Sequence, residues 1–414
     1  MPNRTSKLAR VGRIAPPELH AGQSVWMARG HAALPAHPLG ADLRVDAAII
    51  GGGISGALMA DALLQAGLGV AAFDRMGFVQ GSTPASTAML QFEIDQPLTL
   101  LAKRIGHEKA ARAWWRSSTG VVRLRGRVED LGLRCQFRER HTAYLPGNVL
   151  DLPGLRAEAA ARARIGLRSR MIDRDTLRRL TGIEKPGAIW SAGNAEADPS
   201  QLTRGLWRSA AQRGARLHAP ADIIDIAPRP RGVTLTTACG RSISARHVIL
   251  CTGYELAKLL RPQGYKVIST WAMATHPQPA ALWSSRCLIW EAADPYLYCR
   301  TTSDGRVVAG GEDADFEDAA RRDALIPTKA ARIGRKLGAL MPAIDTRAAF
   351  AWTGCFGESR TGLPAIGAVP GAPHCYAVMG FGGNGITFSA IAAEIIQKAV
   401  LGLPDADADL FAFD

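Results

Sequence analysis

The feature of this sequence that most constrains its fold is a glycine-rich turn that begins at residue 51. Before the turn, residues 47–50 are all apolar, and after it residues 54–66 repeat apolar side chains with a helical period. A further apolar run at residues 70–73 follows within a few positions. Strand, helix and strand in this order predict a βαβ unit, whose parallel strands are buried on both faces and are therefore continuously apolar.

Three glycines in this turn, Gly51, Gly53 and Gly56, have the spacing of a dinucleotide-binding motif. The first allows the tight turn, the second lets a pyrophosphate approach the main chain, and the third lets the helix pack closely on the strand. Asp74 follows 21 positions after Gly53, at the end of the second predicted strand. A carboxylate there suits a ribose hydroxyl group and repels a 2′-phosphate, so the motif favours NAD or FAD over NADP. The alternative is a purely structural turn.

A second glycine-rich turn lies more than 300 residues further along the chain. Residues 380–385 include four glycines, between an apolar run at 375–378 and a helical pattern at 386–401. The positive end of a second helix suits the far pole of an extended cofactor, where a reduced flavin ring carries negative charge. This turn therefore favours FAD over NAD, and its alternative is an ordinary connection between a strand and a helix.

With these two turns, the chain resembles the D-amino-acid oxidase superfamily of FAD-dependent oxidoreductases, which includes glycine, sarcosine and γ-glutamylputrescine oxidases. The loop at 81–88, the segment 219–253 and the motif at 362–367 also carry the resemblance, which extends from residue 24 onward. It implies an α/β fold in which a Rossmann-type FAD-binding domain is interrupted by an α+β substrate domain with a mixed or antiparallel sheet. The expected divisions are an N-terminal arm at 1–39, a FAD-binding domain at 40–140, 199–265 and 350–414, and a substrate domain at 141–198 and 266–349.

The resemblance also assigns cofactor contacts beyond the first turn. Ile223 is expected to contact the adenine through its main chain, although it could be a plain strand residue. Some family members attach FAD to a cysteine near the position of Cys355, but Cys355 is one place off, so FAD is expected to be non-covalent. The predicted cofactor-binding residues are Gly51, Gly53, Ile54, Ser55, Gly56, Asp74, Arg75, Ser82, Thr83, Ser86, Thr87, Ile223, Thr252, Gly253, Gly382, Gly383, Asn384, Gly385 and Ile386.

The sequence departs from the family pattern where a substrate carboxylate would bind. Sarcosine-type members have arginines shortly after the loop at 81–88, whereas this chain has Ala88 and Gln91 there, followed by the acids Glu93 and Asp95. These acids could meet a cationic amine, or they could be surface or capping carboxylates. A clamp for a simple amino-acid carboxylate is therefore not expected.

Candidate substrate residues come from the second domain and from the loops expected to face the flavin ring. Tyrosines and a guanidinium could orient a polar substrate, because arginine presents fixed donors to carboxylates. Their alternatives are sheet packing for the tyrosines and exposed charge for the arginines. The candidates are Gln91, Tyr296, Tyr298, Arg300 and Arg360.

The composition excludes several other functions. The formal net charge is +13, which favours anionic ligands, but the arginine-rich run at 156–179 has no interleaved aromatic residues and no nucleic-acid-binding motif. We interpret it as a solvated basic helical face and expect no nucleic-acid partner. The seven cysteines contain no Cys-x-x-Cys pair and the nine histidines show no metal-ligand spacing. No membrane span is expected, because no apolar stretch reaches about 20 residues, and a cytoplasmic location is expected.

These features predict a flavoenzyme in which FAD accepts a hydride from a carbon that bears an amine, giving an imine. No side chain is assigned as an obligatory catalytic base. The electron acceptor is open, because the strand that carries an oxygen-activating lysine in the resembling oxidases reads Arg306-Val307-Val308 here. Oxygen is one candidate, and a quinone or carrier protein, as in a dehydrogenase, is the other. Two further alternatives are a flavoenzyme or subunit acting on modified RNA and a non-catalytic subunit of a larger dehydrogenase.

Overall fold

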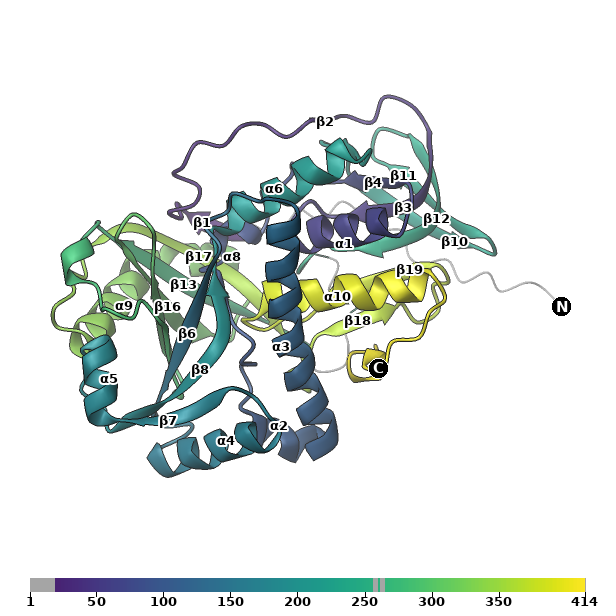
Figure 1. Cartoon of the computed structure of the whole chain (residues 1–414). Helices are drawn as coiled ribbons and strands as arrows, with labels where there is room; N and C mark the ends of the chain where they lie inside the picture. The colour runs from purple at the N-terminus through teal and green to yellow at the C-terminus, as the bar shows by residue number, and fades with distance from the viewer. Residues whose placement is uncertain (1–18, 256–259, 261–264, 414) are drawn as a thin grey trace.

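The strands of the protein form two sheets, one of nine strands and one of ten (Figure 1). This computed structural model describes residues 19–255, 260 and 265–413. The predicted N-terminal arm at 1–39 is therefore described only from residue 19 onward. Residues 256–259 and 261–264 of the predicted FAD-binding domain also lie outside the described residues.

The nine-stranded sheet contains the predicted βαβ unit. Strands β3 and β4 are parallel neighbours, with Ile49 opposite Ala72, and β12 pairs in parallel with β3 and with β19. Residues 242–250 form one continuous strand, β12. The order is β10-β11-β12-β3-β4-β9-β2, and β19 joins β18 to β12. Its strands are β2 (Ala36–His37), β3 (Leu43–Ile50), β4 (Val70–Phe73), β9 (Arg216–His218), β10 (Ile223–Arg229), β11 (Gly232–Thr237), β12 (Ser242–Leu250), β18 (Ala365–Ala368) and β19 (Cys375–Met379).

The ten-stranded sheet is mostly antiparallel, and only the pair β14 and β6 is parallel among its described pairings. Its order is β1-β17-β13-β16-β15-β14-β6-β8-β5, with β7 on β8. Strand β17 belongs to this sheet, although the predicted division places residues from 350 onward in the FAD-binding domain. The strands are β1 (His20–Gly22), β5 (Met89–Leu90), β6 (Arg138–Leu145), β7 (Ser169–Asp173), β8 (Gly187–Glu196), β13 (Lys266–Thr275), β14 (Leu288–Glu291), β15 (Leu297–Thr301), β16 (Val307–Ala314) and β17 (Ala348–Glu358).

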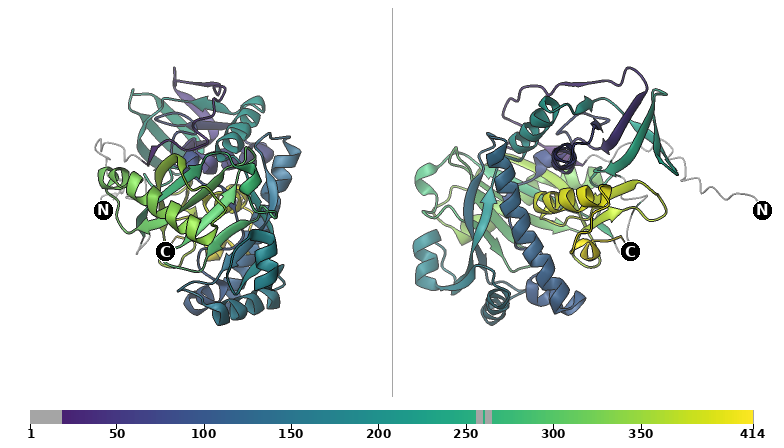
Figure 2. Two further views of the ribbon diagram at one scale, coloured as in Figure 1. Left: turned by 90° about the vertical axis from the view of Figure 1, so that its left-hand side faces the viewer. Right: turned by 45° about the vertical axis from the view of Figure 1, so that its right-hand side comes forward.

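Helices cover both sheets. The green helix α9 crosses β13, β16 and β17 of the ten-stranded sheet, as the left view of Figure 2 shows. Helices α1, α6 and α10 lie together beside the nine-stranded sheet, and the long helix α3 packs on α10 (Figure 1). The helices are α1 (Ile54–Gln65), α2 (Leu98–Ile105), α3 (His107–Asp130), α4 (Leu152–Arg164), α5 (Arg174–Thr181), α6 (Pro199–Gln212), α8 (Ala319–Ala324), α9 (Ile326–Leu340) and α10 (Gly385–Val400), with short 3-10 turns η1 (Thr83–Ala85), η2 (Pro279–Ala281) and η3 (Ala408–Leu410).

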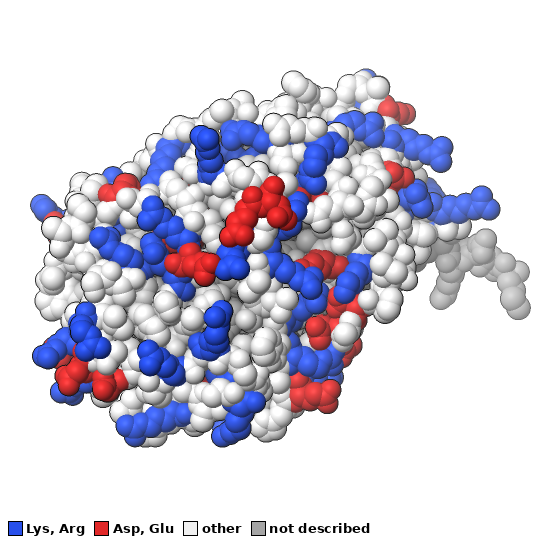
Figure 3. All heavy atoms as spheres, in the orientation of Figure 1, with Lys and Arg blue, Asp and Glu red and all other residues white. Residues whose placement is uncertain are grey.

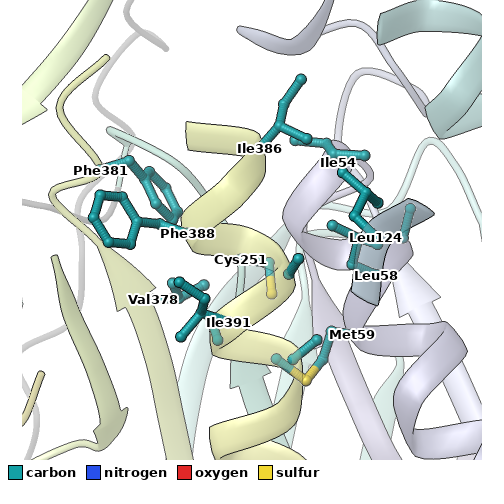
Figure 4. Packing of buried hydrophobic residues seen from close by; sticks show 14 of the residues in the cluster. Ile54, Leu58, Met59, Leu124, Cys251, Val378, Phe381, Ile386, Phe388 and Ile391 are labelled. Atoms are coloured by element: carbon teal, nitrogen blue, oxygen red, sulfur yellow. The ribbon is translucent and has the colours of Figure 1, made fainter. Parts of the chain in front are cut away.

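The core between α1, α3 and α10 fixes where the two glycine turns lie. Ile54 and Ile386, at the first turns of α1 and α10, belong to one buried cluster with Leu124 of α3 (Figure 4). Helix α3 approaches α10 closely at Gly120, where an added Cβ would lie 2.8 Å from Ile391 Cγ1. Burial of large aliphatic side chains stabilises this arrangement by about 1.5–3 kcal/mol each.

Two long helical patterns of the sequence each contain two helices. Residues 97–132 contain α2 and α3, which Gly106 separates by adopting a φ of 90° that a continuing helix cannot have. Residues 319–340 contain α8 and α9, with Pro327 in the first turn of α9. Helix α6 starts at Pro199, because the Asp198 carboxylate accepts hydrogen bonds from the first free N–H groups at Ser200 and Gln201, both 3.0 Å.

Residues 19–39 connect the edges of both sheets. Strand β1 pairs with β17 and strand β2 pairs with β9, so this segment touches one sheet and then the other. Trp26 anchors it, since only 1% of its surface is exposed and its indole N–H donates to the Ser86 carbonyl over 2.8 Å.

On the face shown in Figure 3, basic side chains are spread among acids. The arginine-rich run forms α4, β7 and α5, but one of its members is not on a solvated face. Arg162 is fully buried, pairs with Glu158 over 2.8 Å and lies 4.5 Å from the ring centre of Trp114. The expectation of a wholly solvated basic face is wrong at this position, because the run continues into the protein interior.

Candidate functional site

A continuous cavity of about 660 Å³ brings the two glycine turns together. The starts of α1 and α10 both line it, and the hydroxyl groups of Ser55 and Ser389 lie 2.8 Å apart between the two helices. Its size falls in the range of cofactor and ligand sites. All the predicted cofactor-binding residues except Gly56 line this cavity, together with three of the predicted substrate residues, Gln91, Tyr296 and Tyr298.

The first turn has no room for side chains. Gly51 has a φ of 116°, and an added Cβ would lie 2.2 Å from the Cys251 carbonyl oxygen at the end of β12. An added Cβ on Gly56 would lie 2.0 Å from the Gly51 carbonyl oxygen, so Gly56 serves the packing of α1 rather than the cavity wall. The N–H of Ile54 donates to Thr83 Oγ1 over 3.0 Å, which joins the helix start to the next loop.

The acid after β4 is held rigidly at the cavity edge. One oxygen of Asp74 accepts a hydrogen bond from Gly52 over 2.8 Å, and the other accepts from Met76 and Gly77 at 2.9 and 2.8 Å. The neighbouring Arg75 pairs with Glu255 over 2.7 Å. A carboxylate positioned by three main-chain donors is preorganised to meet hydroxyl groups of a ligand.

Hydrogen bonds hold the loop at 81–88 on the side that faces away from the cavity. Trp26, Trp352 and Arg300 donate hydrogen bonds to its carbonyl groups, over 2.8, 2.8 and 2.6 Å. On the cavity side, the Ser82 hydroxyl is buried and has no hydrogen-bond partner among the residues that the structure describes. An orphaned hydroxyl in a cavity wall is costly unless a ligand satisfies it.

Arg300 was predicted to contact the substrate, but it does not line the cavity. It is 3% exposed, and its guanidinium donates to the carbonyls of Thr87 and Ala197 and lies 3.6 Å from Glu196. Its role in the structure is to hold the loop. Arg360 is likewise absent from the lining of the cavity. Spacing along the chain could not reveal this, because the partners of Arg300 come from distant segments.

The second turn is tied to the segment that follows the loop. Asn384 donates from its side-chain amide to the carbonyls of Gln91 and Glu93, at 3.3 and 3.0 Å, and the N–H of Gly383 donates to Asp95 over 2.5 Å. Of the two acids singled out in the sequence, only Asp95 lines the cavity. Glu93 is 1% exposed and hydrogen-bonds to Thr142.

Aromatic side chains form one end of the cavity. Trp290, Tyr296 and Tyr298 line it, and the two tyrosine rings lie 5.5 Å apart. Tyr298 lies against Gly310, where an added Cβ would be 2.2 Å from its hydroxyl oxygen. Trp290 stacks on Tyr144 with ring centres 3.8 Å apart. No sequence signal singles out Trp290, since a tryptophan in a strand usually indicates core packing.

Two carboxyl groups at this end resist ionisation. Burial raises the pKa of Asp95 to about 6, although the hydrogen bond from Gly383 lowers it, and nearby negative charges on Glu358 and Asp313 raise it further. Solvent that reaches Asp95 tempers this effect, because the residue is exposed along the cavity. Burial also raises the pKa of Asp313 to about 6, against hydrogen bonds from Thr270 and Tyr296. Asp313 was missed in the sequence because no motif surrounds it.

Cys355 lines the cavity on strand β17. Burial raises the pKa of its thiol to about 12, so the neutral thiol dominates near neutral pH. Its sulfur donates a weak hydrogen bond to the Leu19 carbonyl over 3.6 Å. In the described ranges there is no group of three or more potential metal ligands, and no described helix is both long and apolar enough to cross a membrane.

Comparisons with known proteins agree with this geometry. The family model DAO, described as FAD dependent oxidoreductase, matches residues 46–399. A probable oxidoreductase OrdL of Haemophilus influenzae is 22% identical over 86% of this chain and 83% of its own length. The γ-glutamylputrescine oxidoreductase of Escherichia coli is 24% identical over 92% of this chain and 89% of its own. The structure of glycine oxidase from Geobacillus kaustophilus is similar with a TM-score of 0.74 at 20% identity, covering 90% of this chain and 99% of that one.

Proposed function

Since this chain belongs to the DAO family of FAD-dependent oxidoreductases, we propose that it oxidises the C–N bond of a small amine or amino compound to an imine. Bound FAD supplies the redox chemistry by accepting a hydride equivalent. The observation that carries the proposal is the continuous cavity, which joins both glycine turns to the aromatic end formed by Trp290, Tyr296 and Tyr298.

The residues of the cavity fit FAD. The main-chain N–H groups at the starts of α1 and α10 attract negative groups of a ligand. Gly53 and Gly383 have no room for a side chain in the wall, because an added Cβ would lie 3.1 Å from Thr83 Oγ1 and 2.9 Å from Asp95 Oδ1, respectively, so a ligand meets the bare main chain there. The unpaired Ser82 hydroxyl offers a further hydrogen bond. We propose that these groups hold FAD without a covalent bond, since the Cys355 thiol stays protonated.

The aromatic end would bind and orient the substrate. Its tyrosines keep their protons at neutral pH, because burial raises the pKa of Tyr296 and Tyr298 above the usual range. They can therefore donate hydrogen bonds or present apolar ring surface, and the aromatic walls exclude water from the reacting carbon. Gln91 adds an amide nitrogen that has no partner among the described residues.

The electron acceptor is a separate part of the proposal. We propose molecular oxygen or a quinone or carrier protein. The strand with Arg306 has no lysine, and Arg306 donates to the Thr275 carbonyl over 2.9 Å instead of lining the cavity. Among the described residues, no lysine therefore occupies the position of the oxygen-activating lysine of the resembling oxidases.

The absorption spectrum of the purified protein tests the cofactor, and anaerobic bleaching by a panel of amines and amino acids tests the reaction. FAD that precipitation with acid releases from the protein supports non-covalent binding. Admitting air to the reduced enzyme then separates the acceptors: recovery within seconds with peroxide indicates an oxidase, and recovery over minutes without peroxide indicates a dehydrogenase. A protein that is colourless and cannot be reconstituted with FAD would contradict the proposal.

A further inference from the structure

The aromatic end of the cavity carries negative charge that none of the described cations of the cavity wall compensates. The described basic residues that line the cavity, Arg75 and Arg322, already pair with Glu255 over 2.7 Å and with Asp323 over 2.8 Å. Asp95 has no cationic partner among the described residues; its contacts are the N–H of Gly383 and like charges nearby. The cavity therefore offers a free carboxylate beside the aromatic pocket.

A second carboxyl group is a neighbour of the aromatic end. Asp313 interacts with Tyr296 and Thr270, both of which line the cavity, and its Oδ1 is buried without a partner among the described residues. Lys329 is the cation on its other side, but this lysine is shared with Glu312 at 3.8 Å and lies 4.5 Å from the ring centre of Trp271. Both carboxyl groups thus lack a dedicated counter-charge.

We propose that this acidic pocket, formed by Asp95 and Asp313 with the aromatic wall, selects an amine that carries a second cationic amino group in place of a carboxylate. This inference rests on the proposed amine oxidation. An ammonium group in the pocket compensates Asp95 and is attracted to the electron-rich ring faces of tryptophan and tyrosine. The methylene chain between two amines can pack against the same rings, whereas a substrate carboxylate would meet Asp95 as a like charge.

Three compounds with the same four-carbon chain separate the possibilities: 1,4-diaminobutane, butylamine and 4-aminobutanoate. They differ only at the fourth carbon, which carries an ammonium group in the diamine, is a methyl group in butylamine and is a carboxylate in 4-aminobutanoate. We expect anaerobic flavin reduction per unit concentration to be on the order of tenfold faster with the diamine than with butylamine, and slowest with 4-aminobutanoate. The same comparison is repeated with three-carbon and five-carbon chains, because the depth of the pocket sets the chain length at which the far group reaches the acids. A preference for the carboxylate compounds would overturn the inference and leave amine oxidation standing.

Substitution of the two acids identifies which carboxylate recognises the second ammonium group of the substrate. Asp95→Asn and Asp313→Asn are expected to raise the KM for the diamine roughly 10-fold to 100-fold and to change the KM for butylamine less than about threefold. Asp315→Asn is the matched control, because Asp315 follows Asp313 closely, is exposed and pairs with Lys266 over 2.6 Å. FAD content is measured in each variant, since Asp95 also accepts a hydrogen bond from the second turn. Equal losses for the diamine and for butylamine would overturn the assignment.

A binding measurement distinguishes a failure of this inference from a failure of the proposed function. The thermal melting temperature of the FAD-bound protein is recorded with each of the three compounds. If no amine bleaches the flavin, the proposed function fails, but stabilisation by the diamine alone would still support the acidic pocket. Stabilisation by 4-aminobutanoate alone would overturn it.

Discussion

The side-chain amide of Asn384 donates a hydrogen bond to the main-chain carbonyl of Glu93 over 3.0 Å, and a second one to the carbonyl of Gln91 over 3.3 Å. These bonds tie the start of α10 to the segment between the loop at 81–88 and α2. Asn384 therefore helps to hold together the two walls of the cavity near the second glycine turn, beside the bonds that Gly383 and Thr387 donate to the same segment.

Removal of this amide should weaken FAD binding. Asn384→Ala loses two hydrogen bonds of about 1 kcal/mol each, so we expect the dissociation constant of FAD to rise roughly 10-fold to 30-fold. Flavin fluorescence during titration of the cofactor-free protein measures it. Asn148→Ala is the control, because Asn148 also bonds to main-chain groups, at Asp294, but lies outside the cavity. An unchanged affinity in Asn384→Ala would show that the turn needs no such tie.

The first turn should not tolerate even a methyl group. Gly51→Ala combines a φ of 116° with a Cβ placed 2.2 Å from the Cys251 carbonyl oxygen, so we expect a loss of at least about 3 kcal/mol in the free energy of unfolding. Gly67→Ala is matched to it, since Gly67 has a φ of 76° but nothing within 4 Å of an added Cβ. Its expected cost is about 1 kcal/mol. Thermal melting compares the two, and equal melting temperatures would refute the steric argument.

The position of Tyr298 should depend on Gly310. A methyl group in Gly310→Ala would lie 2.2 Å from the tyrosine hydroxyl oxygen, so the ring must move toward the cavity. We expect the KM for the best amine to rise about tenfold, with FAD binding preserved, since small displacements in a pocket lose favourable contacts. Steady-state kinetics measures the KM. Gly338→Ala, whose added Cβ would meet only ordinary contacts, should leave it unchanged.

The acids at the aromatic end should make stability depend on pH. Burial raises the pKa of Asp313 from 3.8 to about 6, so the folded protein binds this proton more tightly than the unfolded chain. Ionisation of Asp313 therefore lowers the free energy of unfolding. This loss is absent below about pH 4, grows as the pH rises to about 6, and stays constant above that. Asp313→Asn should therefore raise the melting temperature at pH 7.5 by about 2 °C or more, and should not raise it at pH 4. A pH-independent effect would contradict this origin.

Arg300 should behave as a structural residue. Arg300→Met leaves Glu196 buried without one of its cationic neighbours and frees two carbonyl groups, so the expected loss is about 3 kcal/mol in stability. Arg347→Met removes an exposed pair with Asp345 and should cost less than about 1 kcal/mol. Chemical denaturation compares them. A large rise in substrate KM without loss of stability would restore Arg300 as a substrate ligand.

Short-range patterns in the sequence predict the parts of this protein that local residues specify. The apolar runs and the glycine spacing specified the βαβ unit, and Asp198 with Pro199 specified the start of α6, because periodicity and capping act over a few residues. The two glycine turns and Asp74 indicated FAD for the same reason, since each wall of the cofactor site is a local motif.

Which side chains meet across the cavity follows from the packing of distant segments. Asp313 interacts with Tyr296 although no motif singled it out, and Arg300, a candidate substrate residue in the sequence, instead donates to the Thr87 carbonyl. Sequence spacing specifies which face of a strand a residue takes, but the partners on that face come from the order in which distant strands pair. The glycines thus reveal the cofactor, and the charge of the substrate pocket emerges only when the two sheets pack around it.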